Sequence, residues 1–338
     1  QNANFKEGNI KTNAKNSSFD YLAMQFRLWK RMGMAVGFLP FSTVGYSLSN
    51  TSELTKDEDG TVINKTASYA GDGGLQQVFA GVGFKVLDNL SIGANISYIY
   101  GDITHSVTTA FSNSSSFSSV RLDKISINDY KLDFGLQYSY KFNKKHVLNF
   151  GAVYSLGHSV NGKGYKYNQK WLNGADYPST QTGDTITNAF SLPHTFGAGL
   201  TYVYDNRLTI GADFTYQQWE DAKFYNEKSY FSNRTKIAAG AEFVPNPYSR
   251  NYLKRVRYRV GGYYSDPYTK VDGQDGTREY GVSAGFGFPL FQSKSILNIS
   301  GQYVRVSPKV KGMLEENYLK INIGLTFNER WFMKWKVD

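Results

Sequence analysis

The chain has 338 residues, a formal net charge of +10, 16% aromatic residues, no cysteine and a mean hydropathy of −0.45. It contains no run of about 20 apolar residues, which excludes a helical membrane protein, and the lack of cysteine excludes disulfides, thiolate metal sites and a cysteine nucleophile. Lysine and arginine are spread along the chain without a compact aromatic and basic platform, so we expect no nucleic-acid binding.

Strict alternation of apolar with polar or small residues is the main signal in this sequence. It is clear in four segments, LSIGANISYIY (90–100), YKLDFGLQYSYKF (130–142), RLTIGADFTY (207–216) and LKINIGLTF (319–327). A period of two predicts β-strands with one apolar face. These segments reach the length of about 9–11 residues that a transmembrane strand needs, and the polar face includes charges that a dry core would exclude.

We predict about thirteen strands, joined by connections that are alternately short and long. In chain order they lie near 19–29, 33–49, 75–86, 90–111, 119–142, 146–161, 186–204, 207–219, 231–244, 254–267, 278–291, 295–307 and 315–327. Tight turns at one end and long polar loops at the other are typical of an outer-membrane β-barrel. Because single-chain bacterial barrels have an even number of strands, we expect about fourteen, with one strand and an N-terminal segment preceding Gln1.

The chain is expected to form one barrel domain, residues 1–338. Residues 1–18 would be an external loop or the remnant of the first strand, and 328–338 a basic and aromatic tail at the periplasmic leaflet. The longest external loops are expected at 50–75 and 162–185.

A proline interrupts the predicted strand GFLPFSTVGY, residues 37–46. Proline cannot donate to a sheet ladder, so Pro40 indicates either a simple bulge or a lateral gap in the wall. By alternation, Phe38, Pro40, Ser42, Val44 and Tyr46 would face lipid. The apolar Leu39 and Phe41 would face the lumen, where polar residues are the rule.

The chain resembles the FadL/TodX family of outer-membrane transporters for hydrophobic compounds, in the form found in Bacteroides and its relatives. The resemblance is carried by FDYLAMQF (19–26), KRMGMAVGFLPFSTVGYSL (30–48) and ENYLKINIGLTFNERWFMKWK (316–336). It implies a kinked third strand through which an apolar ligand leaves sideways into the membrane, and an N-terminal hatch. The Asn-Pro-Ala signature of that hatch has no counterpart in this sequence.

The resemblance implies uptake of hydrophobic or amphipathic molecules such as long-chain fatty acids, by loop capture and lateral diffusion in the outer membrane, without cofactor or metal. Aromatic residues of the long loops would capture the ligand. The expected ligand-contacting residues are Phe38, Leu39, Pro40, Phe41, Phe79, Tyr165, Tyr167 and Trp171. Expected partners are the ligand, outer-membrane lipid and lipopolysaccharide.

Three alternatives stay open at this point. The charged lumen would suit a general porin. FadL-type barrels are also used as subunits of secretion or surface-assembly systems, such as the type IX shuttle, which would imply a protein partner. A hydrolase would need one of the four histidines, His105, His146, His158 and His194, but these pair only loosely with common residues, so we expect no enzyme.

Overall fold

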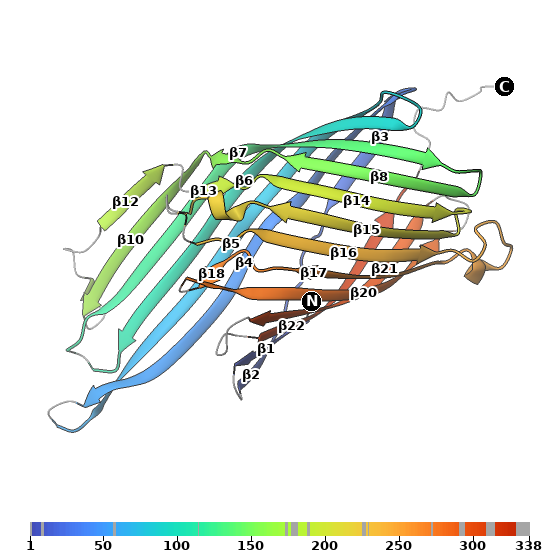
Figure 1. Ribbon diagram of the computed structural model, residues 1–338. Coiled ribbons are helices and arrows are strands. Elements are labelled where there is room, and N and C mark those ends of the chain that lie inside the picture. The colour runs from blue at the N-terminus through green and yellow to red at the C-terminus, as the bar shows by residue number, and fades with distance from the viewer. Residues whose placement is uncertain are drawn as a thin grey trace, which may run out of the picture.

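The computed structural model describes the chain except for residues 1, 8–9, 57–58, 114, 173–174, 177–181, 188–189, 225–227, 229, 272, 291–294, 309–314 and 329–338. The expected tail, 328–338, therefore lies outside the described residues except for Asn328. The described part of the chain is almost entirely β-sheet, with two short 3-10 turns (Figure 1). Across these residues we find no helix long and apolar enough to cross a membrane.

The alternation predicted from the sequence is confirmed, because each of the predicted segments contains a strand. The elements are β1 (Asn2–Glu7), β2 (Ile10–Lys15), β3 (Leu22–Trp29), β4 (Met32–Lys56), β5 (Val62–Lys85), β6 (Leu90–Phe111), β7 (Ser118–Lys141), β8 (His146–Ser155), β9 (His158–Val160), β10 (Gly162–Leu172), β11 (Ala175–Asp176), β12 (Thr182–Thr187), β13 (Phe190–Leu192), β14 (Thr195–Tyr204), β15 (Leu208–Gln217), η2 (Trp219–Asp221), β16 (Arg234–Phe243), η3 (Tyr252–Lys254), β17 (Arg257–Ser265), β18 (Lys270–Val271), β19 (Gln274–Asp275), β20 (Thr277–Pro289), β21 (Ile296–Pro308) and β22 (Glu315–Thr326).

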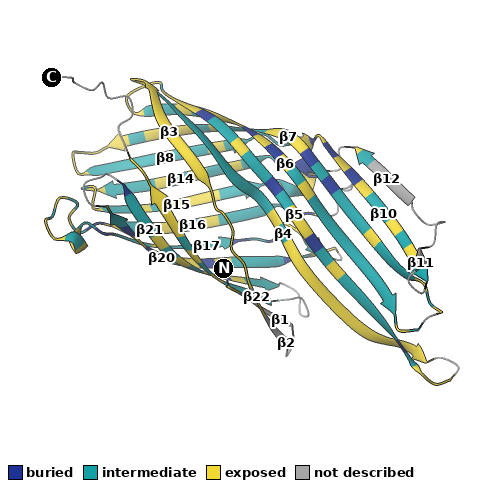
Figure 2. Cartoon of the chain, turned by 180° about the vertical axis from the view of Figure 1, so that it is seen from behind, coloured by how far each residue is buried: buried dark blue, intermediate teal, exposed yellow. Residues whose placement is uncertain are grey.

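One large antiparallel sheet forms a curved wall. Strands β3 to β8 pair in chain order, β8 pairs with β14, and the sheet continues through β15, β16, β17, β20, β21 and β22. Strand β22 pairs with β1, and β1 pairs with β2. Because residues 16–21 connect β2 to β3, the chain itself links the two ends of the sheet (Figure 2).

Short turns lie at one end of this wall, as the predicted order of alternately short and long connections requires. Asp205 and Asn206, between β14 and β15, both have positive φ, 51° and 52°. That conformation is the one a two-residue hairpin turn of type I′ requires, and Asn and Asp tolerate it better than most residues.

Strands β4 and β5 extend well beyond their predicted bounds of 33–49 and 75–86, and β4 to β7 are the longest strands among the described residues. They have 22 to 25 residues, against 10 in each of β14, β15 and β16. At about 3.3 Å per residue, β4 would reach about 80 Å. The prediction that 50–75 and 162–185 are loops is wrong: 50–56 and 62–75 belong to β4 and β5, and 162–172 forms β10, which pairs with β7.

The two faces of the wall differ in polarity. Large apolar residues are exposed on the outward face, as in β22, where Ile321 is 67% and Ile323 73% exposed. On the inward face Arg259 Nε lies 2.6 Å from Glu242 Oε2. An apolar exterior around a polar interior is the reverse of a water-soluble sandwich and suits a surrounding of lipid.

Candidate functional site at the Pro40 bulge

Pro40 lies at a β-bulge between β4 and β5. The two strands pair residue for residue up to Pro40 opposite Gln76, and pairing then resumes with Ser42 opposite Leu75. Phe41 is therefore one extra residue in β4. A bulge is a place where the missing N–H of proline breaks no regular ladder, which explains how a proline is accommodated here.

The bulge reverses which residues of β4 face inward. Phe38, before it, pairs with Val78 on the outward face, whereas Ser42 pairs with Leu75, which is buried inside. The expectation that Ser42, Val44 and Tyr46 face lipid is therefore wrong. Tyr46 lies on the inward side, with its hydroxyl 3.0 Å from Nδ1 of His105.

The sheet bends along a line that starts at the bulge in β4 and continues across β5 and β6. Gly73 on β5 and Gly101 on β6 have positive φ, 106° and 142°. A Cβ on Gly73 would collide with the carbonyl oxygen of Asp102, and one on Gly101 with the carbonyl oxygen of Gly74. Glycine is therefore required for the close approach of strands at this bend.

The outer half of β4 has an unpaired edge. Strand β3 pairs with β4 only between Trp29 opposite Met32 and Leu22 opposite Phe38. From Leu39 to Lys56, β4 pairs with β5 on one side and has no strand partner on the other among the described residues. The break in the wall thus begins one residue before Pro40 (Figure 2).

An apolar cluster fills the interior next to the bulge. Its buried members are Leu75, Ile99, Ile125, Ile127, Val160 and Leu192. Phe41 packs against it from β4. Val160 and Leu192 come from β9 and β13, which form a separate two-stranded sheet and lie against the wall strands. The space within the cluster, which Asp129 also lines, is too small to hold water, so the inner approach to Pro40 is closed in this structure.

An aromatic group continues this apolar cluster beyond the end of β15. Trp219 lies 5.2 Å from both Phe231 and Tyr268, measured between ring centroids. Phe190, which packs on the inner cluster, lies 6.2 Å from Trp219. Apolar side chains therefore run without interruption from this group to Phe41.

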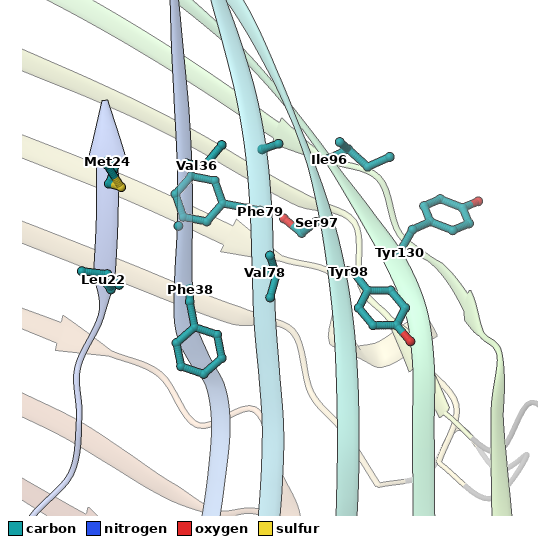
Figure 3. A pocket seen from close by; sticks show the side chains of 12 residues that line it. Leu22, Met24, Val36, Phe38, Val78, Phe79, Ile96, Ser97, Tyr98 and Tyr130 are labelled. Atoms are coloured by element: carbon teal, nitrogen blue, oxygen red, sulfur yellow. The ribbon is translucent and has the colours of Figure 1, made fainter. Parts of the chain in front are cut away.

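The outward face carries a groove of about 620 Å³ at the same level, which we call the outer groove (Figure 3). It spans β3 to β7 and is lined by Leu22, Met24, Val36, Phe38, Val78, Ala80, Ile96, Tyr98 and Tyr130, together with Gly37, Phe79 and Ser97. Ala80 pairs with Val36 and Ile96, and its small side chain forms the depression between them. The ring of Phe19 stacks on Phe38 at 6.1 Å.

Gly37 and Phe79 are neighbours in the lining of the outer groove. The ring of Phe79 lies against this glycine, so that a Cβ there would be 2.5 Å from Phe79 Cε1. Phe79 pairs with the buried Ser97, whose hydroxyl accepts a hydrogen bond of 2.7 Å from the Gln77 amide. A glycine and one aromatic ring therefore separate the outer groove from the interior.

Five of the eight sequence-predicted residues meet in this region. Phe38 and Phe79 line the outer groove, Leu39 and Pro40 pair with β5 at the break in the wall, and Phe41 contacts the inner cluster. The other three, Tyr165, Tyr167 and Trp171, lie on β10, which is separated from β4 by β7, β6 and β5.

The sequence reasoning missed the inner cluster. The sequence did contain a signal for this cluster. Ile99 and Ile127 are apolar, although they lie on the same inward face as Ser97 and Lys131, where polar residues were expected. The contribution of Val160 and Leu192 had no local signal, since it depends on the pairing of two distant segments.

Two titratable groups, Tyr46 and His105, lie beyond the bulge on β4 and β6. Burial lowers the pKa of His105, and the nearby Asp123 carboxylate partly opposes this. Burial raises the pKa of Tyr46. Both groups are therefore held neutral near pH 7, and their hydrogen bond joins β4 to β6.

The histidines do not form a nucleophile and base pair with serine in the part of the chain that the structure describes. His146 and His194 form hydrogen bonds with tyrosine hydroxyls, 2.6 Å from Tyr202 and 2.8 Å from Tyr154. His158 Nε2 lies 3.4 Å from Asp129. The same residues include no group of three or more side chains able to hold a metal ion.

A model of the BamG family matches residues 1–338. The chain belongs to the BamG family. Among solved structures it is similar to the CymD monoaromatic hydrocarbon channel, with 11% identity, a TM-score of 0.57, and 95% of this chain and 85% of that chain covered. No curated protein sequence matches it.

Two further solved structures have the same fold. One is the Pseudomonas putida toluene transporter TodX, with 14% identity, a TM-score of 0.55, and 95% of this chain and 85% of that chain covered. The other is a Pseudomonas aeruginosa FadL homologue, with 14% identity, a TM-score of 0.53 and the same shares covered. At these identities the similarity shows that this member of the BamG family has a FadL-type fold.

Proposed function

We propose that this protein is an outer-membrane channel that passes hydrophobic or amphipathic small molecules sideways through its wall at Pro40. The observation that carries this is the coincidence of three features at one place. The β3–β4 ladder ends at Phe38, the apolar inner cluster reaches Phe41, and the outer groove opens on the other side. No cofactor and no covalent chemistry are involved.

The cost of unpaired main-chain groups in lipid supports a port at Pro40. A ladder broken within lipid leaves main-chain groups unpaired, which costs several kcal/mol unless the gap admits another partner. The residues of β4 between Phe41 and the groove residue Phe38, which are Leu39 and Pro40, carry no charge. The likeness to a hydrocarbon channel and a toluene transporter supports an apolar cargo. The sequence resemblance to the Bacteroides-type relatives of FadL supports the same proposal.

Cellular uptake tests the proposal. Cells lacking their own transporter would carry the intact protein or the variants Leu39→Asp and Phe41→Asp, and take up a labelled long-chain fatty acid. Val203→Asp, which places the same charge on β14 away from the bulge, is the matched control. We expect uptake with the intact protein and the control and a loss of about tenfold or more in the two variants at equal surface levels, because a charge in an apolar passage is costly. Equal uptake by all four would contradict a port at Pro40.

A second function is favoured by the unpaired edge of β4. Residues 42–52 include no charge and no proline, which are the usual protections of an exposed strand edge. A subunit of a secretion or surface-assembly complex could use this edge to pair with a strand of another protein. In that case the protein would be purified in a stoichiometric complex, Ser47→Lys would release the partner, and fatty-acid uptake would be absent.

A general porin is favoured less by this arrangement. The inward charges, such as Arg259 and Glu242, would suit a polar solute. The inner cluster, however, packs apolar side chains from β5, β6, β7, β9 and β13 together without space for water. Passage of sugars through the protein, measured in a planar bilayer, would support the porin function.

A further inference from the structure

The outer groove continues toward a pair of opposite charges on the same face of the wall. Along β6, Tyr98 in the groove is followed on the outward face by Tyr100 and then by Asp102. The rings of Tyr98 and Tyr100 stack at 5.5 Å. Asp102 Oδ2 lies 3.0 Å from Nζ of Lys124 on β7.

The spacing of these features matches an amphipathic molecule. Asp102 comes four residues after Tyr98, which is about 13 Å along β6. Between them, at the level of Tyr100, lie the uncharged polar side chains of Gln76 and Asn128, which share its register. The face thus passes from an apolar groove, through a neutral polar band, to a paired anion and cation.

The groove has the dimensions and chemistry of a binding site and not only of a lipid-facing surface. Its volume of about 620 Å³ lies within the range usual for small-molecule sites. Side chains border it at both edges, with Leu22 and Met24 of β3 on one side and Tyr98 and Tyr130 on the other, and it is open toward the outside. Its lining includes no charged residue.

We propose that the outer groove binds one acyl chain of a zwitterionic phospholipid, whose head group lies against the Asp102–Lys124 pair. The carboxylate of Asp102 would accept a hydrogen bond from the ammonium group, and Lys124 would donate a hydrogen bond to the phosphate. Asp72 and Lys163, which share the registers of Thr104 and Ser126 on the same face, add one charge of each sign, so the four groups together have no net charge. A lipid with two phosphates and no ammonium group, such as lipid A, would be matched by an excess of cations. The proposal depends on the proposed membrane location but not on transport.

Native mass spectrometry of the purified full chain tests this binding. The protein, folded in detergent, would be mixed with phosphatidylethanolamine, and lipid retained after detergent removal would be counted. We expect about one phosphatidylethanolamine per protein, and at least about tenfold less retained in Val78→Trp, whose side chain would fill the groove.

Val82→Trp is the matched control. Val78 and Val82 are both on the outward face of β5 and are 45% and 44% exposed, but only Val78 lines the groove. The control should retain the lipid as the intact protein does. If Val78→Trp does not fold, as judged by its mobility before and after heating, Met24→Trp fills the groove from β3 and decides the question.

Competition identifies the head group. Phosphatidylglycerol, lipid A and a fatty acid would each be added against bound phosphatidylethanolamine, and Asp102→Asn should remove the preference for phosphatidylethanolamine over phosphatidylglycerol. The proposal is overturned if the intact protein retains no lipid, if Val78→Trp and Val82→Trp retain the same amount, or if lipid A or the fatty acid displaces phosphatidylethanolamine at equal concentration. A protein that transports but retains no phospholipid refutes this proposal and leaves the proposed function intact.

Discussion

Replacing Gly73 with alanine should destabilise the bend beside Pro40. Gly73 has a φ of 106°, which side-chain-bearing residues rarely adopt, and a Cβ would collide with the carbonyl oxygen of Asp102 on β6. Holding a residue in such a conformation costs about 1–3 kcal/mol. Relieving the collision also requires β5 and β6 to separate, so we expect the free energy of unfolding to fall by about 2–4 kcal/mol in total.

Gly83→Ala on the same strand is the control for this substitution. Its φ is not in the left-handed region, and the nearest atom to its added Cβ, the carbonyl oxygen of Ile92, would be 4.0 Å away, an ordinary contact. The free energy of unfolding should therefore change by no more than about 0.5–1 kcal/mol, and it can rise, because alanine restricts the unfolded chain more than glycine does.

Urea unfolding in detergent micelles, followed by the fluorescence of the five tryptophans, measures both variants. The midpoint should move to lower urea for Gly73→Ala and stay nearly constant for Gly83→Ala, with the same slope in both. If the two variants lose equal stability, or if Gly73→Ala loses none, the bend does not depend on glycine and the structural argument for it fails.

Two further predictions concern side chains on the inward face. Because burial lowers the pKa of His105 in the folded protein, the unfolded chain binds more protons at acidic pH; stability should fall as pH decreases from 7 to 5, and fall less in His105→Asn, as urea midpoints at each pH would show. Gly37→Ala should displace the ring of Phe79 and destabilise the protein by about 1–3 kcal/mol; the double variant Gly37→Ala with Phe79→Leu should recover part of that loss, and no recovery would contradict the contact.

The strands could be predicted from the sequence because their signals are local. Alternation fixes which residues face outward wherever the ladder is regular, and β6 has the predicted bounds, 90–111. The outer halves of β4 and β5 could not be recognised in this way, because their sequence is rich in serine and threonine and alternates little in polarity. There the sheet is held by main-chain pairing and by hydroxyl pairs such as Ser49 with Ser68 at 3.2 Å and Thr51 with Thr66 at 3.1 Å.

The candidate site was predictable only in part, for a related reason. Pro40 is a local signal, and the apolar Leu39 and Phe41 beside it indicated the right region. The outer groove depends on five neighbouring strands, and the pairing of β9 with β13 joins residues about thirty positions apart, which no window of the sequence reveals. The reversal of facing after Phe41 follows from a single extra residue, whose position only the register shows.

Deleting Phe41 would separate the effect of the bulge from the effect of its side chain. Pro40 pairs with Gln76 and Ser42 with Leu75, so without Phe41 these pairs become consecutive and the β4–β5 ladder becomes regular with both faces unchanged. We expect the deletion variant to fold and reach the surface, but to lose uptake of an apolar molecule, because the regular ladder removes the local distortion of the wall. Phe41→Gly lacks the same ring but keeps the extra residue, and it should retain uptake if the bulge is the port. Because the two variants differ only in the backbone, the difference in uptake between them measures the bulge alone, and equal uptake would refute the lateral port at Pro40.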